Sequence, residues 1–281
     1  MAIAHNRAAH DRVGGAYDAG HPEIFNETEQ ARLAQAVAHV VGLARLEGRE
    51  ARPADPADVL DVLDVGTGTG NLVRHFLAHD ARVTAADLST ALLDEVRARF
   101  AATGRVTTAP LNGRDLRPLA DGRFDIVATY SVLHHVPDYV ALVGEMARVA
   151  RPGGVVYIDH ERSDESWTSA AYREFLGEAV VWPRRRWWFF LQPSRYWKRI
   201  RPRLEWRRWG NRRWMPEGDL HIWPDDHIEW AKVRAALEAA GCSIEMQTDY
   251  LLFEARYDRG VWERWRARTA DMRVLVARKR A

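Results

Sequence analysis

The chain has 281 residues, of which 47% are hydrophobic and 28% charged, and its formal net charge is +2. This length favours one α/β domain with appendages, and the ordinary balance of apolar and charged residues excludes global disorder. No apolar run approaches the ~20 residues of a membrane-spanning helix, and the first residues lack the apolar stretch of a signal peptide. A single cysteine, Cys242, excludes an internal disulfide and a CxxC metal site. We therefore expect a cytoplasmic protein.

The first 58 residues predict a helical arm. Residues 1–20 are polar and mixed, and we expect no fixed element there before Tyr17. From Ile24 to Leu46 apolar residues recur at helical spacing, which predicts an amphipathic helix. A charged linker with two prolines, at 47–58, ends the arm.

Strands and helices alternate in the next hundred residues. Apolar runs predict strands at 59–65, 81–89, 106–109, 124–130 and 155–159, and helical patterns predict helices at 71–78, 90–101 and 138–149. The sequence Arg-Pro-Gly-Gly at 151–154 predicts a turn before the fifth strand. Such alternation predicts a parallel sheet with helices on both faces and right-handed crossovers.

The alternation stops at residue 160 and resumes at residue 226. A helix is predicted at 226–239, with Asp225 or Asp226 as its N-cap and Gly241 at its end. Strands at 243–253 and 272–277 complete the sheet. The predicted fold class is α/β, a doubly wound, mostly parallel seven-stranded sheet. We divide the chain into an N-terminal helical arm or lid (1–58), a core (59–160), an inserted helical cap (161–225) and the C-terminal part of the core (226–281).

A glycine-rich loop follows the first predicted strand, running from Asp64 to Asn71 as DVGTGTGN. Glycine is needed where the backbone turns sharply or where a ligand approaches too closely for a Cβ atom. In open α/β sheets the ligand crevice lies at the carboxyl ends of the strands. The G-x-G-x-G spacing differs from the G-x-G-x-x-G of dinucleotide sites, and Asp64 would repel a pyrophosphate but suits an α-amino group. Asp87 ends the second strand, where a carboxylate can accept hydrogen bonds from ribose hydroxyls.

Five motifs in chain order resemble those of the class I S-adenosylmethionine (SAM)-dependent methyltransferases. They are LDVGTGTGNL (63–72), Asp87 in TAADLS, LNGRDL (111–116), YSVLHHVPD (130–138) and RPGG (151–154). The resemblance covers about residues 59–160. It implies SAM as the cofactor, S-adenosylhomocysteine (SAH) as the product, and methyl transfer to a small molecule. A nicotinamide-dependent dehydrogenase and a SAM-binding protein without catalysis are the alternatives.

The resemblance also implies the residues that bind the cofactor. Asp64 is expected to hold the methionine amino group, Thr67 or Asn71 its carboxylate, and Asp87 the ribose. For Asn71, a role as helix cap is the alternative. Asn112 stands where the family often has an aspartate that binds the adenine amino group. The full predicted set is Tyr17, Asp64, Gly66, Thr67, Gly68, Gly70, Asn71, Asp87, Leu88, Asn112, Gly113, Tyr130 and His135.

Four side chains are candidate catalytic bases for an acceptor that must lose a proton. His134 and His135 follow the fourth strand, and His160 and Glu161 follow the fifth, so all four are expected at the crevice edge of the sheet. A histidine titrates near neutral pH and suits proton removal. The alternative is that these side chains only support the structure. Tyr17 is the candidate lid residue, because N-terminal arms of similar methyltransferases often cover the cofactor.

Residues 182–215 form a segment rich in tryptophan and arginine, which we call the Trp/Arg segment. Between Arg184 and Arg213 there are twelve basic residues and one acid, and nine of the twelve tryptophans lie between Trp182 and Trp230. Insertions at this place in the fold commonly carry substrate specificity. The predicted substrate contacts are Tyr17, Trp182, Arg186, Trp187, Trp188, Arg195 and Trp197.

Several interpretations of the Trp/Arg segment stay open. It forms a helical cap with a tryptophan core, a pocket for an acidic or phosphate-bearing apolar metabolite of specialised, isoprenoid or lipid metabolism, a nucleic-acid surface, or a membrane contact. Tryptophan faces suit the cation formed when an isoprenoid diphosphate is methylated at carbon. The absence of a recognisable RNA-binding domain argues against nucleic acid. We expect no metal, because residues 221–227 match no ligand spacing, and exposed tryptophans would favour a homo-oligomer.

Overall fold

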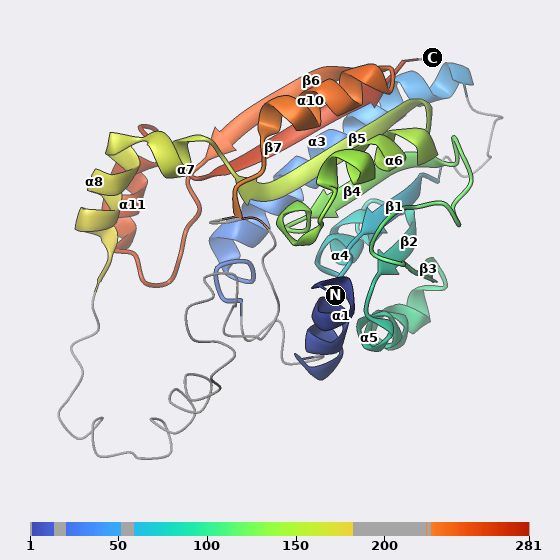
Figure 1. Ribbon diagram of the computed structural model, residues 1–281, viewed down its shortest axis with the longest axis horizontal. Coiled ribbons are helices and arrows are strands. Elements are labelled where there is room, and N and C mark those ends of the chain that lie inside the picture. The colour runs from blue at the N-terminus through green and yellow to red at the C-terminus, as the bar shows by residue number, and fades with distance from the viewer. Residues whose placement is uncertain (1, 14–20, 52–58, 182–222, 224–225, 281) are drawn as a thin grey trace.

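The computed structural model describes residues 2–13, 21–51, 59–181, 223 and 226–280. These residues form a sheet with the strand order β3-β2-β1-β4-β5-β7-β6 (Figure 1). The strands are β1 (Asp61–Val65), β2 (Arg82–Asp87), β3 (Val106–Pro110), β4 (Phe124–Tyr130), β5 (Ala150–Arg162), β6 (Cys242–Tyr250) and β7 (Met272–Lys279). β7 is antiparallel to both of its neighbours, and the other pairs are parallel. The doubly wound, mostly parallel seven-stranded sheet is confirmed.

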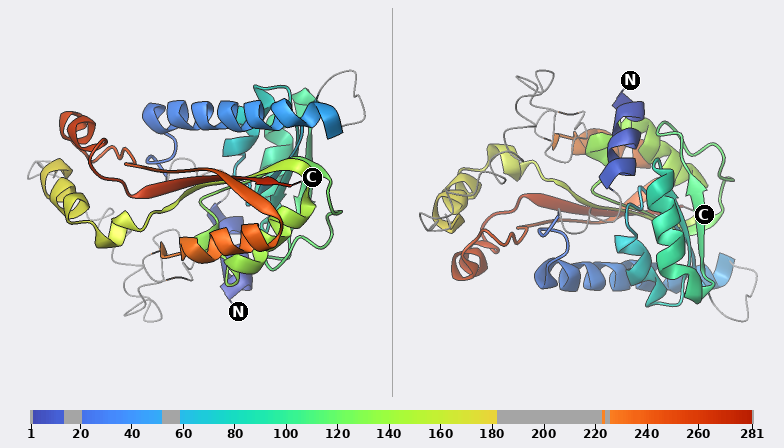
Figure 2. Two further views of the ribbon diagram at one scale, coloured as in Figure 1. Left: turned by 90° about the horizontal axis from the view of Figure 1, so that it is seen from above. Right: turned by 90° about the horizontal axis from the view of Figure 1, so that it is seen from below.

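Helices cover both faces of the sheet (Figure 2). One face is covered by α3 (Glu27–Ala51), α4 (Asn71–Leu77) and α5 (Thr90–Phe100), and the other by α6 (Tyr139–Val149) and α10 (Trp230–Ala239). Each face has its own hydrophobic core. β4 is buried along its whole length, as expected for a central parallel strand that is covered on both sides.

Further helices lie outside these layers. α1 (Ala2–Val13) packs against α5, and α8 (Ala170–Ala179) packs against α11 (Arg259–Trp265) beyond the end of the sheet (Figure 1). α8 follows the short α7 (Glu165–Thr168). Phe175, Tyr257 and Trp262 belong to a small core between α8 and α11. The predicted insertion therefore begins with two helices, whereas residues 182–222, which include the Trp/Arg segment, lie outside the described residues.

Residues 151–154 are not the predicted turn between elements, because they belong to β5. The pairing of β5 with β4 shifts between Phe124–Ala150 and Ile126–Val155, so four residues of β5 lie opposite Asp125. Gly153 takes a φ of 74°, and the Nε atom of Arg151 lies 2.5 Å from the Asp125 carboxylate. The Pro-Gly-Gly sequence therefore makes a bulge inside a strand, which local turn chemistry alone does not distinguish from a turn.

The predicted N-cap of the helix at 226–239 is wrong. α10 begins at Trp230, with Glu229 in the N-cap position, and Asp226 lies before it at a φ of 59°. Asp225 lies outside the described residues. Tertiary contacts set the later start of the helix at Trp230. The Glu229 N–H donates to the Tyr139 hydroxyl, and the Trp230 indole donates to a carbonyl oxygen of β5. Gly241, at a φ of 82°, follows the helix end as predicted.

The N-terminal arm contains more helix than predicted. α1 occupies part of the segment that was expected to lack a fixed element, and α3 continues to Ala51, five residues into the predicted linker. α3 begins where the Asn26 side chain accepts a hydrogen bond from the Glu29 N–H at 3.0 Å. α11 was not predicted either. No helix in the described part of the chain is long and apolar enough to cross a membrane.

Candidate functional site

The glycine loop turns sharply between β1 and α4. Gly66, Gly68 and Gly70 have φ values of 72°, 53° and 88°, in the region that L side chains rarely adopt. A Cβ atom at Gly66 would approach Val132 to 2.4 Å, and one at Gly70 would approach Phe100 to 2.6 Å. At Gly68 a Cβ atom would meet no described protein atom within 4 Å. Gly66 and Gly70 therefore allow close packing within the protein, whereas the space beside Gly68 is open among the described residues.

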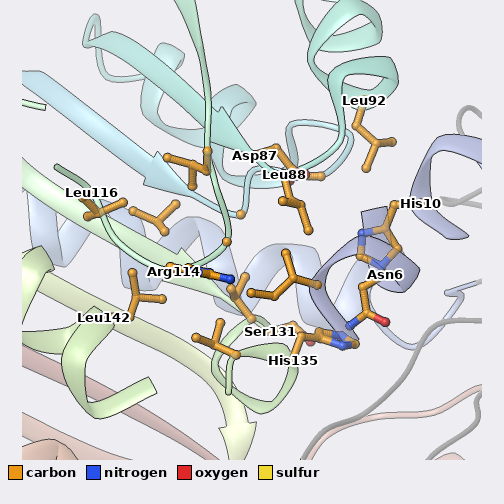
Figure 3. Close-up of a pocket in the computed structure, with 18 of the residues that line it drawn as sticks. Asn6, His10, Asp87, Leu88, Leu92, Arg114, Leu116, Ser131, His135 and Leu142 are labelled. Atoms are coloured by element: carbon orange, nitrogen blue, oxygen red, sulfur yellow. The ribbon is translucent and has the colours of Figure 1, made fainter. Parts of the chain in front are cut away.

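Two adjoining cavities lie at the carboxyl ends of β1, β2 and β4. The larger, of about 130 Å³, reaches from the glycine loop to Leu88, Gly113 and α1 (Figure 3). The smaller, of about 40 Å³, is lined by Asp64 and Asn71 among others. Their common lining residues are Gly66, Gly68, Tyr130 and Ser131. The cavities therefore meet beside the glycine loop, with Tyr130 and Ser131 lining both.

Two buried carboxylates flank the glycine loop. Asp87, which is 5% exposed, accepts hydrogen bonds from the Gly68 N–H at 2.9 Å and the Ser89 N–H at 2.8 Å. Asp64, which is 1% exposed, accepts one from the Thr67 hydroxyl at 2.7 Å. Burial raises the pKa of Asp64 to about 7, although the Thr67 hydrogen bond opposes this and the charge of Asp87 adds to it. Burial also raises the pKa of Asp87. A ligand with a positive group near Asp64 and hydroxyl donors near Asp87 would satisfy both carboxylates.

The loop after β3 contributes to the larger cavity, but the Asn112 side chain does not line it. The exposed Asn112 accepts hydrogen bonds from the backbone N–H groups of Arg114 and Asp115 and donates to the Asp115 carboxylate. It therefore shapes a turn. Gly113, Arg114 and Asp115 line the cavity instead, so Asp115 is the acidic side chain nearest the predicted adenine position in sequence.

Helix α1 closes one side of the larger cavity, as Figure 3 shows for Asn6 and His10. The Asp11 carboxylate accepts a hydrogen bond from the Ser89 hydroxyl at 2.5 Å. Ile3 packs so close to Gly113 that a Cβ atom added at Gly113 would lie 2.8 Å from the Ile3 side chain. These residues were not predicted as part of the site, although the spacing of Ile3, Asn6 and His10 is helical. Tyr17, the predicted lid residue, and the predicted substrate contacts from Trp182 to Trp197 lie outside the described residues.

A bulge at the end of β5 distributes three consecutive side chains, two of them predicted site residues, over both faces of the sheet. The pairing with β7 shifts between Ile158 and Glu161, and His160 has a φ of 61°. Consecutive residues normally point to opposite faces. Here Asp159 and His160 both meet side chains of α3, whereas Glu161 reaches the loop after β4. Bulges with strained backbone often lie beside functional sites, where they redirect a side chain.

A buried polar network joins α3 to this bulge, and we call Glu29, Arg32, Tyr130, Asp159, His160 and Tyr250 the α3 network. The Arg32 guanidinium donates to Glu29 at 2.6 Å and to Asp159 at 2.9 Å. The Tyr130 hydroxyl donates to Glu29 at 3.0 Å, and the same hydroxyl oxygen lies 2.9 Å from Nδ1 of His160. Burial by itself would raise the pKa of Glu29, but the contacts with His160 and Arg32 lower it to about 2. Glu29, Arg32 and Tyr250 were not predicted from the sequence, because no motif contains them.

Glu161 supports the loop that carries the two neighbouring histidines. Its Oε1 accepts hydrogen bonds from the N–H groups of Val132 and Leu133, both at 2.7 Å, and its Oε2 lies 2.9 Å from Nδ1 of His134. Glu161 and His134 are buried. The next side chain, His135, lines the larger cavity, and its ring centre lies 5.9 Å from that of His10. The four candidate bases therefore lie in three different surroundings.

Comparison with known proteins shows which family this chain resembles. A family model described as "Methyltransferase domain" matches residues 63–158. The chain is 36% identical over 195 residues to demethylmenaquinone methyltransferase of Parafrankia sp. (strain EAN1pec), covering 62% of this chain and 69% of that protein. It is 31% identical to ubiquinone biosynthesis O-methyltransferase of Alkalilimnicola ehrlichii over 133 residues, 46% of this chain and 54% of that protein. In fold it resembles magnesium protoporphyrin IX methyltransferase from Synechocystis with bound SAH, with a TM-score of 0.52, 16% identity and coverage of 97% and 98% of the two chains.

Proposed function

Because this chain belongs to the class I SAM-dependent methyltransferases, we propose that it methylates a small apolar molecule that carries an acidic or phosphate group. The observation that carries the SAM dependence is the pair of buried carboxylates, Asp64 and Asp87, on the two sides of Gly68. This pair suits a ligand with an ammonium group at one end and ribose hydroxyls at the other.

The residues present fit SAM. Gly68 leaves space for a ligand, and Nδ2 of Asn71 is a buried donor with no hydrogen-bond partner among the described residues. We place the adenosine half in the larger cavity, with Asp87 on the ribose and Leu88 and Gly113 beside the base. The methionine half lies in the smaller cavity, with Asp64 on its ammonium group and Asn71 on its carboxylate. Thr67, the other residue predicted for the carboxylate, donates its hydroxyl to Asp64 and its N–H to the Ala86 carbonyl oxygen instead. Asp115 replaces Asn112 as our candidate for the adenine amino group, because Asn112 is engaged in its own turn.

The chemistry of transfer requires little from acid or base residues at the sulfur. SAM supplies a methyl group that is already activated on a sulfonium. The protein contributes position and the exclusion of water, for which α1 over the larger cavity is suited. An acceptor that loses a proton also needs a base.

We propose that His135 and His160 remain the candidate bases. Glu161 and His134 bind each other, and Glu161 also accepts two backbone N–H groups, so we assign Glu161 to positioning the loop. His135 lines the larger cavity, and Nε2 of His160 has no hydrogen-bond partner among the described residues. With the true acceptor, His135→Gln or His160→Gln should lower kcat, and His160→Gln should do so at unchanged SAH affinity. A normal kcat in both variants would contradict the assignment.

The acidic or phosphate-bearing character of the substrate rests on the sequence of the Trp/Arg segment. Arginine binds carboxylate and phosphate groups in a bidentate manner, and tryptophan covers apolar surface. Two relatives, demethylmenaquinone methyltransferase and ubiquinone biosynthesis O-methyltransferase, are named for small molecules of the quinone class. The predicted contacts Trp182, Arg186, Trp187, Trp188, Arg195 and Trp197 stay part of this proposal.

SAH affinity should decrease in mild acid. The pKa of Asp64 is raised to about 7, and an ammonium group binds its ionised form, so the Kd of SAH should increase about tenfold per pH unit below 7. In the ligand-free protein the same pKa shift has the opposite effect on stability, because it makes the protein more stable as the pH falls. The folded state takes up this proton more readily than the unfolded state, so this group's contribution to the free energy of unfolding increases as the pH falls from about 7 toward 3.8.

Calorimetric titration with SAH between pH 7.5 and 5.5 checks this prediction. Asp64→Asn is the control variant, because it should bind more weakly but with a Kd that changes much less with pH. An SAH affinity of the unaltered protein that stays constant over this range would contradict the role given to Asp64.

The function is tested by mixing the protein with SAM and paired acceptors. Each pair consists of an apolar phenol or quinol and the same molecule with an added carboxylate or phosphate group. An isoprenoid diphosphate is tested separately. Release of SAH is measured in every reaction. We expect turnover with an anionic member and little with its neutral partner. Turnover of the neutral member alone would refute the substrate class, and absence of SAM and SAH binding would refute the function.

A further inference from the structure

A chain of three polar side chains connects α3 to the glycine loop. Gln30 on α3 lies between His75 and Asn71, which are both on α4. None of the cofactor contacts proposed above includes Gln30 or His75. Asn71, however, lines the smaller cavity together with Asp64 and Thr67. The orientation of the Asn71 amide therefore decides whether a donor or an acceptor faces the ligand.

The oxygen of the Asn71 amide is fixed by its partners. A guanidinium has only donors, so the Asn71 atom that lies 2.9 Å from the Arg74 side chain is Oδ1. The same oxygen accepts a hydrogen bond from Nε2 of Gln30 at 3.1 Å. Nδ2 is left as a buried donor with no hydrogen-bond partner among the described residues. The Asn71 side chain therefore has an unused donor at the smaller cavity.

The Gln30 amide is fixed in the same way. Its Nε2 lies 2.8 Å from the carbonyl oxygen of Ile24, which can only accept. Its Oε1 therefore faces Nε2 of His75 at 2.8 Å, and that ring nitrogen must carry a hydrogen. Burial lowers the pKa of His75 to about 4, so the ring is neutral near pH 7 and in this tautomer. One carbonyl and one imidazole thus hold Gln30 in the orientation in which it donates to Asn71.

We propose that Gln30 is a positioning residue that fixes the Asn71 amide so that its Nδ2 donates to the carboxylate of the SAM methionine group. The inference rests on the proposed function and extends it to a side chain that touches no cofactor. It divides the labour at this end of the ligand. Asp64 takes the ammonium group, and the amide held by Gln30 takes the carboxylate. The carboxylate contact then depends on α3, which lies outside the segment that the family model matches.

The test compares two probes that differ only at this end. SAH carries the amino-acid group, and 5′-methylthioadenosine has the same adenosine and sulfur without it. Gln30→Glu replaces the donor by an acceptor, so Asn71 turns its Nδ2 toward α3 and its oxygen toward the ligand. Calorimetry should show an SAH affinity about tenfold lower and a methylthioadenosine affinity within about twofold of the unaltered protein. Gln35→Glu, at an exposed position of the same helix, should change neither.

A double-mutant cycle shows whether Gln30 acts through Asn71. In an Asn71→Ala background, Gln30→Glu should weaken SAH by less than about twofold. The inference would be overturned if Gln30→Glu lowered the affinities for both probes equally or lowered neither. It would also be overturned if Gln30→Glu lowered the SAH affinity about tenfold in the Asn71→Ala background. Gln30→Met has a similar length and no donor, so it replaces Gln30→Glu if that variant does not fold, with an expected loss of about threefold for SAH alone. If the unaltered protein binds neither probe, the proposed function falls as well.

Discussion

Replacing Asp87 by asparagine is expected to weaken SAH binding about a thousandfold. Both carboxylate oxygens of Asp87 stabilise the conformation of the site, because one accepts a hydrogen bond from the Gly68 N–H and the other from the Ser89 N–H. Each oxygen retains a second lone pair for a ribose hydroxyl. The amide of the variant has one oxygen, and its nitrogen cannot accept from any of these groups. Two hydrogen bonds to a charged acceptor, at about 1.5–3 kcal/mol each, correspond to a loss of this size.

Calorimetric titration with SAH measures the Asp87→Asn effect. Asp94→Asn is the matched control, since Asp94 is 70% exposed on the neighbouring helix α5 and should leave the affinity unchanged. A thermal melt of each variant separates loss of binding from loss of folding. An Asp87→Asn protein that is folded and binds SAH within about threefold of normal would remove the ribose assignment and the placement of the adenosine half.

Replacing Arg32 by alanine is expected to lower the free energy of unfolding by about 3–5 kcal/mol. Arg32 neutralises two carboxylates, Glu29 and Asp159, which are 2% and 0% exposed. It also lies over the Tyr250 ring, 3.9 Å from its centre. Without the guanidinium both acids remain buried, and a buried charge that loses its partner is strongly unfavourable. For a chain of this size the melting temperature should fall by about 10 °C.

Arg97→Ala provides a matched control for Arg32→Ala. Arg97 also pairs with an acid three residues before it, Asp94, but both side chains are more than half exposed. Exposed pairs contribute about 0–1 kcal/mol, so this variant should melt near the unaltered protein. Equal melting temperatures for the two variants would show that the α3 network does not stabilise the fold. Differential scanning calorimetry or circular dichroism measures the difference.

The cofactor side of the site is predictable because its signals are local. Asp64 lies in the last two residues of β1, the glycines follow that strand directly, and Asp87 ends β2, so strand ends alone place them at one edge of the sheet. Residue type alone is not enough to assign a contact. Asn112 occupies a motif position, yet its side chain is used by its own turn, and Asp115 three residues later lines the cavity.

The supporting residues are not predictable because their partners are remote in sequence. Gln30 meets a residue 41 positions away, and Arg32 meets one 127 positions away. Both residues lie in the first two turns of α3. The apolar spacing of this helix predicts only that one of its faces packs against the core, and it says nothing about polar partners. The bulge at His160 is hidden for a related reason, since it exists only in the pairing with β7.

The position of β7 has a consequence for synthesis of the chain. β7 lies between β5 and β6, so the outer edge of β5 acquires its partner only after residues 163–271 have been made. On the ribosome that edge presents unpaired N–H and C=O groups while the Trp/Arg segment emerges. Unpaired edges are templates for association with other chains. We expect the nascent protein to depend on chaperones during this interval, and the finished protein to lose that dependence once residues 272–279 close the sheet.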